Sequence, residues 1–212
     1  MYHQQVSERY LLRNSQPQDA KGLEALQRKV FPNLSAAEIL TEQHYLHHME
    51  VFPEGQFVVL DQKKIIATSA AIRSNHGTES DHTFLEVSGN LWFDTHEPDG
   101  QWLYGMDMGV DPDYRKQGLA RAMYGARQQL CHDLQLRGQM IVGMLNGYQK
   151  HADRMSIDAY GEQVLQGKLV DPTIAAQLKS GFRMIRVMKD YLNDPTCGNA
   201  GMLMLLERST SL

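Results

Sequence analysis

The chain has 212 residues, of which 42% are hydrophobic and 22% are charged. These are ordinary globular proportions, and a domain of this length buries about 70% of its unfolded surface, which excludes general disorder, collagen-like repeats and a coiled coil. Lys and Arg number 21 against 25 Asp and Glu, for a net charge of -4. The negative charge disfavours nucleic acid and anionic membranes as partners.

Two cysteines, Cys131 and Cys197, are present without a CxxC pair, so we expect reduced thiols and no disulfide framework. Residues 1–16 lack a basic region followed by an apolar run, and no segment has the roughly 18 apolar residues of a membrane helix. We therefore expect a cytoplasmic protein with a single domain over residues 1–212.

The first third of the chain predicts a short strand at 10–13 and then two helices. A capping box at 15–18, with proline in the first turn, begins a helix whose apolar residues recur up to Val30. A second capping box, at 35–38, begins a helix predicted to run to about Met49.

The middle of the chain predicts strands. Residues 57–60 and 65–68 flank a polar turn and are expected to form a hairpin. A short strand at 90–93 and a central strand at 102–110 are expected to follow.

After residue 110 helices and strands alternate. Apolar residues at helical spacing predict a long helix between 119 and 137, and 140–144 reads as a buried strand parallel to the central one. A helix over 171–181 and two closing strands, at 182–187 and 202–206, complete the expected α and β mixture.

The most informative segment leads from the central strand into the long helix, with the spacing Val110-x-Pro112-x-x-Arg115-x-x-Gly118-x-Ala120. The first N–H groups of a helix have no internal partner and carry partial positive charge, so they can bind a diphosphate. Gly118 lacks a Cβ where the diphosphate must approach, and Arg115 and Lys116 add positive charge. The alternative is a loop glycine beside two solvated cations.

This motif, followed by a long helix and a buried strand, resembles the GNAT superfamily of N-acetyltransferases along nearly the whole chain. The resemblance implies an α+β fold: a central mixed, largely antiparallel sheet with two splayed parallel strands, flanked by helices on both faces. It implies acetyl-CoA as co-substrate, with an amine attacking the thioester directly in a ternary complex. The binding residues that it implies are Met108, Gly109, Val110, Arg115, Lys116, Gln117, Gly118, Leu119 and Ala120.

The C-terminal half more narrowly resembles the acetyltransferase-like domain found fused to nitrilase-type carbon–nitrogen hydrolases. The residues that carry this resemblance are Tyr148-x-x-His151-Ala152-Asp153, Tyr160, Asp171-Pro172-Thr173, Gly181-Phe182 and Asp190-Tyr191-Leu192. The Glu-Lys-Cys machinery of the hydrolase is not found, so the resemblance implies a stand-alone module. A nitrilase-type amidase and a second copy of the chain are the candidate protein partners.

Superfamily members commonly carry a tyrosine four residues before the Gly-Phe pair, where it protonates the departing thiolate, but this chain has Gln177 there. An insertion at 147–170 offers Tyr148 and Tyr160 as substitutes, and Tyr148 is nearer the expected cleft. Both tyrosines can instead pack the insertion, which is the favoured interpretation for Tyr160.

Asp107 and Glu86 are the candidates for the base that removes the amine proton. Strand alternation points Asp107 away from Met106 and Met108, and a carboxylate within an apolar strand is costly unless it is paired or functional. A structural hydrogen bond is the alternative for Asp107, and a solvated position is the alternative for Glu86.

His44 and His48 have the four-residue spacing that zinc uses, but no HExxH pattern or third ligand accompanies them, so no metal is expected. The acceptor is predicted to be a small-molecule or peptide amine, in a pocket walled by the second helix, residues 74–100 and the insertion. Two alternatives remain: a non-catalytic acyl-CoA-binding or regulatory module, and an acyltransferase that uses a longer acyl-CoA.

Overall fold

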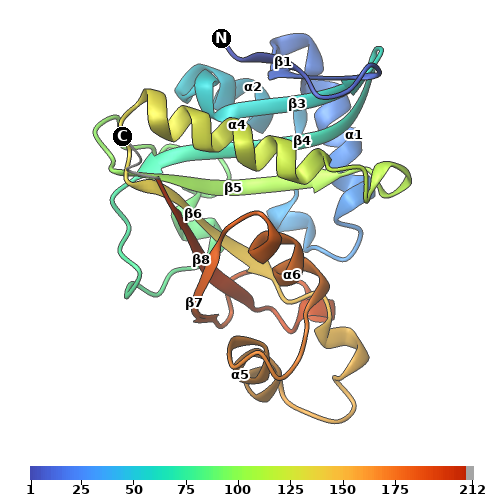
Figure 1. Ribbon diagram of the computed structural model, residues 1–212, viewed down its shortest axis with the longest axis vertical. Helices are drawn as coiled ribbons and strands as arrows, with labels where there is room; N and C mark the ends of the chain where they lie inside the picture. Colours follow the sequence, from blue (N-terminus) through green and yellow to red (C-terminus); the bar gives the residue numbers. More distant parts are fainter. Residues whose placement is uncertain (209–212) are drawn as a thin grey trace.

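The computed structural model describes residues 1–208 and contains an eight-stranded sheet in the order β1-β2-β3-β4-β5-β6-β8-β7 (Figure 1). The strands are β1 (His3–Gln5), β2 (Tyr10–Asn14), β3 (Gln56–Asp61), β4 (Lys64–Ser74), β5 (Trp102–Val110), β6 (Gly138–Met144), β7 (Arg183–Met188) and β8 (Gly201–Glu207). Neighbouring strands are antiparallel, apart from the parallel pair β5 and β6. This confirms the predicted mixed, largely antiparallel sheet.

Helices cover both faces of the sheet. In Figure 1, α4 lies in front of the sheet, with α6 in front of β6 and β8, while α1 and α2 lie behind. The helices are α1 (Ala20–Val30), α2 (Glu42–Val51), α3 (Phe84–Val87), α4 (Leu119–Asp133), α5 (Ile157–Leu165) and α6 (Pro172–Lys179). One apolar cluster fills the α1/α2 side, and two others lie under α4 and α6.

The second predicted helix is interrupted. Ser35 accepts a hydrogen bond from the N–H of Ala37, but this cap begins a single 3-10 turn, Ala36–Glu38. Ile39 is extended, and α2 begins after Thr41, which is the N-cap. The prediction of one continuous helix was wrong because a second N-cap residue, Thr41, follows Ser35 six residues later.

The strand predicted at 90–93 is also absent, and a tight loop takes its place. Asn90, Leu91 and Phe93 have φ angles of 53°, 75° and 64°. Strand backbone requires negative φ, so these left-handed residues cannot extend a sheet. His48 stabilises the loop: its Nε2 donates to the Leu91 carbonyl at 2.6 Å, and its ring stacks on Phe93.

Candidate active site

The parallel strands β5 and β6 separate part of the way along their length. They are paired from Trp102 with Gly138 to Gly105 with Ile141, and no further. In Figure 1 the two strands start side by side and then diverge, and α4 begins at the open end. Within residues 1–208, no strand pairs with 106–110 on the β6 side. Main-chain groups along this edge are therefore available to a ligand that lies between the strands.

The loop at the open end has the geometry of an anion site. Gly118 is the N-cap of α4 with φ 79°, and a Cβ placed on it would meet no atom within 4 Å. Arg115, Lys116 and Gln117 are exposed beside it. The free N–H groups of a 15-residue helix and two cations thus face open space, which suits a diphosphate.

Salt bridges anchor the start of this loop. The carboxylate of Asp111 is buried and accepts hydrogen bonds from the Nζ atoms of Lys29 and Lys64, at 2.6 and 3.1 Å. Burial raises the pKa of Asp111, but these contacts and the N–H of Asp113 outweigh it and lower the pKa to about 2. The loop is therefore tied to α1 and β4, while Arg115 and Lys116 stay free of salt bridges within the described residues.

A β-bulge lies just beyond the last pair of β5 and β6. Ala70 of β4 pairs with Asp107, and Ala71 pairs with Gly105, so Met106 is the extra residue. Met106 packs in the cluster on the α1/α2 side, and Met108 packs on the α4 side. The expectation that Met106 and Met108 share a face was wrong because the bulge interrupts the alternation.

Asp107 lies on the α2 side of the opening. Its partner Ala70 belongs to the cluster on that side, and its charge acts on Tyr45 of α2, whose pKa rises through burial first and then through the Asp107 and Glu24 carboxylates. Asp107 is 8% exposed, and its Oδ2 has no hydrogen-bond partner in the described chain. Burial raises its pKa to about 7, although Arg127 and the N–H of Met108 act in the opposite direction.

Glu86 lies in the one-turn helix α3. Its carboxylate accepts hydrogen bonds from the N–H and hydroxyl of Thr83, at 2.7 and 3.0 Å, and these bonds lower its pKa. Glu86 is exposed and completes a capping box with Thr83. The structure therefore gives this carboxylate a helix-capping role.

Tyr148 and Tyr160 both belong to the insertion. The hydroxyl of Tyr148 donates to the Met155 carbonyl at 3.3 Å, and that of Tyr160 donates to Asp171 Oδ2 at 3.0 Å. Burial, and then the neighbouring Asp171 carboxylate, raise the pKa of the Tyr160 hydroxyl well above its usual value. The packing interpretation fits Tyr160, which is buried, and Tyr148 makes its hydrogen bond within the insertion.

Tyr124 and Arg127, both on α4, are two buried residues that the sequence reasoning missed. The amide of Gln177 donates to the hydroxyl of Tyr124 at 3.3 Å and occupies the space where a side chain on Gly143 would lie. Arg127, also on α4, is buried against the bulge. Its position one turn after Met123, within the apolar stripe of the helix, is a signal that could have revealed it.

The histidine pair and the two thiols were the remaining candidates for metal binding and for nucleophilic attack. Within residues 1–208, no group of three or more His, Cys, Asp and Glu side chains could hold a metal ion. Burial raises the pKa of both Cys131 and Cys197 to about 12. Among the helices of residues 1–208, none is long and apolar enough to span a membrane.

Two proteins of Bacillus subtilis (strain 168) are similar to this chain. The uncharacterized N-acetyltransferase YkwB is 33% identical, over 91% of this chain and 86% of its own length. The probable hydrolase YhcX is 32% identical over 88% of this chain, which spans only 36% of YhcX.

Solved structures show the same fold at 20% identity. The GphF GNAT-like decarboxylase in complex with isobutyryl-CoA has a TM-score of 0.77, over 93% of this chain and 99% of that one. The loading GNATL domain of CurA from Lyngbya majuscula has a TM-score of 0.78, over 93% and 97%. The model of the acetyltransferase (GNAT) family matches residues 21–151, more than half of the sequence. The divergent parallel strands and the glycine-capped helix beside them are thus those of a GNAT protein, and the chain belongs to this acetyltransferase family.

Proposed function

We propose that the protein transfers an acetyl group from acetyl-CoA to a primary amine by direct attack in a ternary complex. The observation that carries this proposal is the divergence of β5 and β6 beside the N-terminus of α4. The diphosphate would lie at residues 115–120, and the pantetheine arm would lie along the free edge of β5 at 108–110. A thioester between the strands would then be reached by the amine from the α1/α2 side.

Asp107 is the base in this proposal because it is the buried carboxylate on that side with an unpartnered oxygen. It takes a proton from the ammonium group, and the amine nitrogen attacks the thioester carbon. The C–S bond then breaks to release the CoA thiolate, and the nitrogen loses its second proton, which balances the proton that the thiolate takes up. Tyr148 remains the proposed proton donor to the thiolate, but this would require it to leave the Met155 carbonyl. Glu86 is the weaker candidate for the base because it is exposed and caps α3.

The residues that border the opening on the amine side are mainly apolar. Met106 is buried, and Val142 and Met144 are partly exposed and pack on the same cluster. We therefore favour a primary amine with an apolar group near the nitrogen, from a small molecule or a peptide. A longer acyl-CoA is the alternative donor, and isobutyryl-CoA, bound by the GphF relative in fold, is the one to test against acetyl-CoA.

Titration calorimetry with acetyl-CoA tests the donor site first. Arg115→Ala removes a phosphate-directed cation, and we expect about tenfold weaker binding. Gly118→Val places a branched side chain at φ 79° and in front of the helix N-terminus, so binding should be lost. Wild-type affinity in both variants would show that the donor binds elsewhere.

Thiol release in the presence of a panel of amines then tests transfer. Asp107→Asn should lower kcat at least tenfold while acetyl-CoA affinity is retained, because only the proton acceptor is removed. Asp99→Asn, in an exposed loop, is the matched control. Donor binding without turnover for any amine would instead favour the non-catalytic acyl-CoA-binding module.

A further inference from the structure

The buried face of α4 carries a cation. Arg127 is 1% exposed, and the hydrogen bonds of its guanidinium go to main-chain carbonyls. Its Nε has no partner within the described residues. Removing a guanidinium from water is costly unless contacts compensate, so its burial calls for a specific role.

The bulge in β5 supplies those contacts. Nη2 of Arg127 donates to the carbonyls of Ala70 and Asp107, at 2.5 and 2.7 Å. Both residues lie at the register shift between β4 and β5. Gly105, the last β5 residue paired to β6, makes room for the guanidinium, since a Cβ there would lie 2.3 Å from Nη1. The Arg127 side chain of α4 therefore fits against the bulge in β5 and into the space left by Gly105, at the point where β5 and β6 separate.

We propose that Arg127 is a positioning residue, which holds β5 in its bulged register and thereby keeps the Asp107 carboxyl on the α2 side of the opening. This inference rests on the proposed function, because it concerns the residue that we propose as the base. Without Arg127, the carbonyls of Ala70 and Asp107 would lose the donor that they share. Restoring regular pairing would then rotate residues 106 and 107 relative to the opening.

The charge of Arg127 gives this role an electrostatic signature. The titratable groups that face Asp107 are Tyr45 from α2 and Arg127 from α4, while β4 contributes the apolar Ala70. Arg127 is the charged group that lowers the pKa of Asp107, against the effect of burial. Removal of this cation should therefore raise that pKa above about 7.

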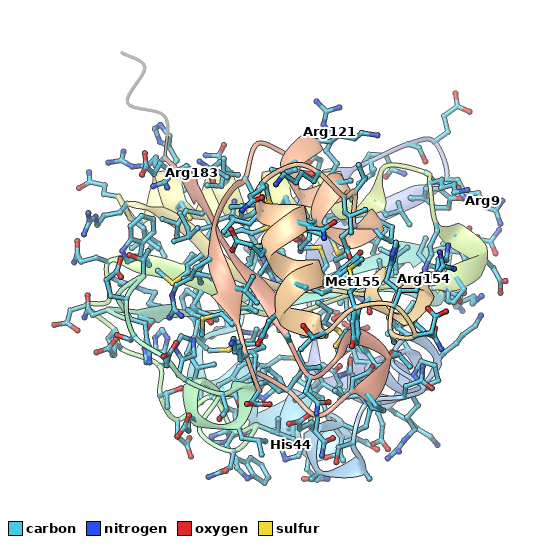
Figure 2. The ribbon with its side chains drawn as sticks, turned by 90° about the horizontal axis from the view of Figure 1, so that it is seen from below. Arg9, His44, Arg121, Arg154, Met155 and Arg183 are labelled. Carbon is cyan, nitrogen blue, oxygen red and sulfur yellow. The ribbon has the colours of Figure 1, made fainter. Side chains whose placement is uncertain are left out.

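The direct test is an NMR titration of the side-chain carboxyl carbon of Asp107, assigned with the Asp107→Asn variant. In Arg127→Met, which keeps most of the side-chain volume, the midpoint should rise by about one pH unit or more. Arg127→Lys retains a cation and should shift it less. Arg183→Met is the matched control, because Arg183 lies at the surface on β7 and pairs with Glu207 (Figure 2). An unmoved midpoint in folded Arg127→Met overturns the proposal.

Kinetics supply the second readout. Arg127→Met should lower kcat about tenfold and move the acid limb of the pH profile upward, with acetyl-CoA affinity within about twofold of wild type. A lower melting temperature with unchanged kcat and acid limb would mean that Arg127 only stabilises the fold. If Arg127→Met fails to fold, Gly105→Ala displaces the guanidinium without removing its charge, and unchanged kcat there contradicts the proposal.

The two hypotheses fail in different ways. Wild-type turnover in Asp107→Asn would refute the assignment of the base. The carboxyl titration needs no turnover, so it would still decide whether Arg127 controls Asp107. In the Asp107→Asn background, Arg127→Met should lower kcat by less than twofold, since the two residues act as one unit.

Discussion

Asp107, the proposed base, stands at a position that costs stability at neutral pH. Burial raises its pKa from 3.8 to about 7, so the folded protein binds this proton more tightly than the unfolded chain does. The stability that this group contributes is therefore full below about pH 4 and is lost as the pH rises to about 7. A carboxylate kept in such a place at neutral pH is the pattern expected of a base.

Asp107→Asn should consequently separate stability from activity. Wild type should lose stability as Asp107 ionises between about pH 4 and about pH 7, whereas the amide of the variant has no proton to lose. The melting temperature of Asp107→Asn minus that of wild type should therefore increase over this range and then level off. Over the same range, the kcat/KM of wild type for the amine should rise with pH and reach a plateau above about pH 7. Parallel thermal melts and initial rates provide both curves. A melting difference that does not change with pH would contradict the raised pKa.

At the scale of elements, the carboxylate of Asp171 contacts both the insertion at 147–170 and the helix that follows it. Oδ1 of Asp171 caps α6 by accepting from the N–H groups of Thr173 and Ile174, at 2.8 and 3.2 Å. Its Oδ2 accepts from the N–H of Gly147 at 2.7 Å and from the hydroxyl of Tyr160 at 3.0 Å. The same carboxylate thus joins the start of the insertion, its helix and the helix that follows.

Asp171→Ala should loosen the insertion as well as the helix end. Loss of the N-cap alone costs about 1 kcal/mol, and the freed N–H of Gly147 adds to it. Trypsin should cleave after the exposed Arg154 faster than in wild type, as followed by mass spectrometry (Figure 2). Asp171→Asn, which can keep the cap but loses one acceptor at Oδ2, should be cleaved at an intermediate rate. Equal rates in all three proteins would show that Asp171 does not secure the insertion.

The elements also show what the sequence can predict. The central strand, the long helix and the parallel strand after it were predicted from apolar periodicity, since tertiary contacts there agree with local preference. The bulge at Met106 could not be predicted because it depends on Arg127, Gly105 and Ala70, which are far apart in sequence. For the same reason the loop at 90–93 was read as a strand: its left-handed residues are stabilised by His48, some forty residues earlier.

At the scale of the whole molecule, the sheet separates two approaches to the opening. Arg121 of α4 and His44 of α2 lie on opposite sides of the molecule in Figure 2. The cation-bearing loop at 115–118 lies at the start of α4, whereas Asp107 faces α2. In the proposed mechanism, donor and amine would therefore bind together from different faces, with no need for one to leave first.

This arrangement predicts sequential kinetics without an acetylated enzyme. Double-reciprocal plots at several amine concentrations should intersect, and mass spectrometry after incubation with acetyl-CoA alone should show no added acetyl group. The thiols cannot easily substitute as nucleophiles, because Cys131 and Cys197 are buried and the pKa of each is raised to about 12. A thiol with such a pKa is almost wholly protonated at neutral pH. Parallel lines with a stable acetyl adduct would refute direct transfer.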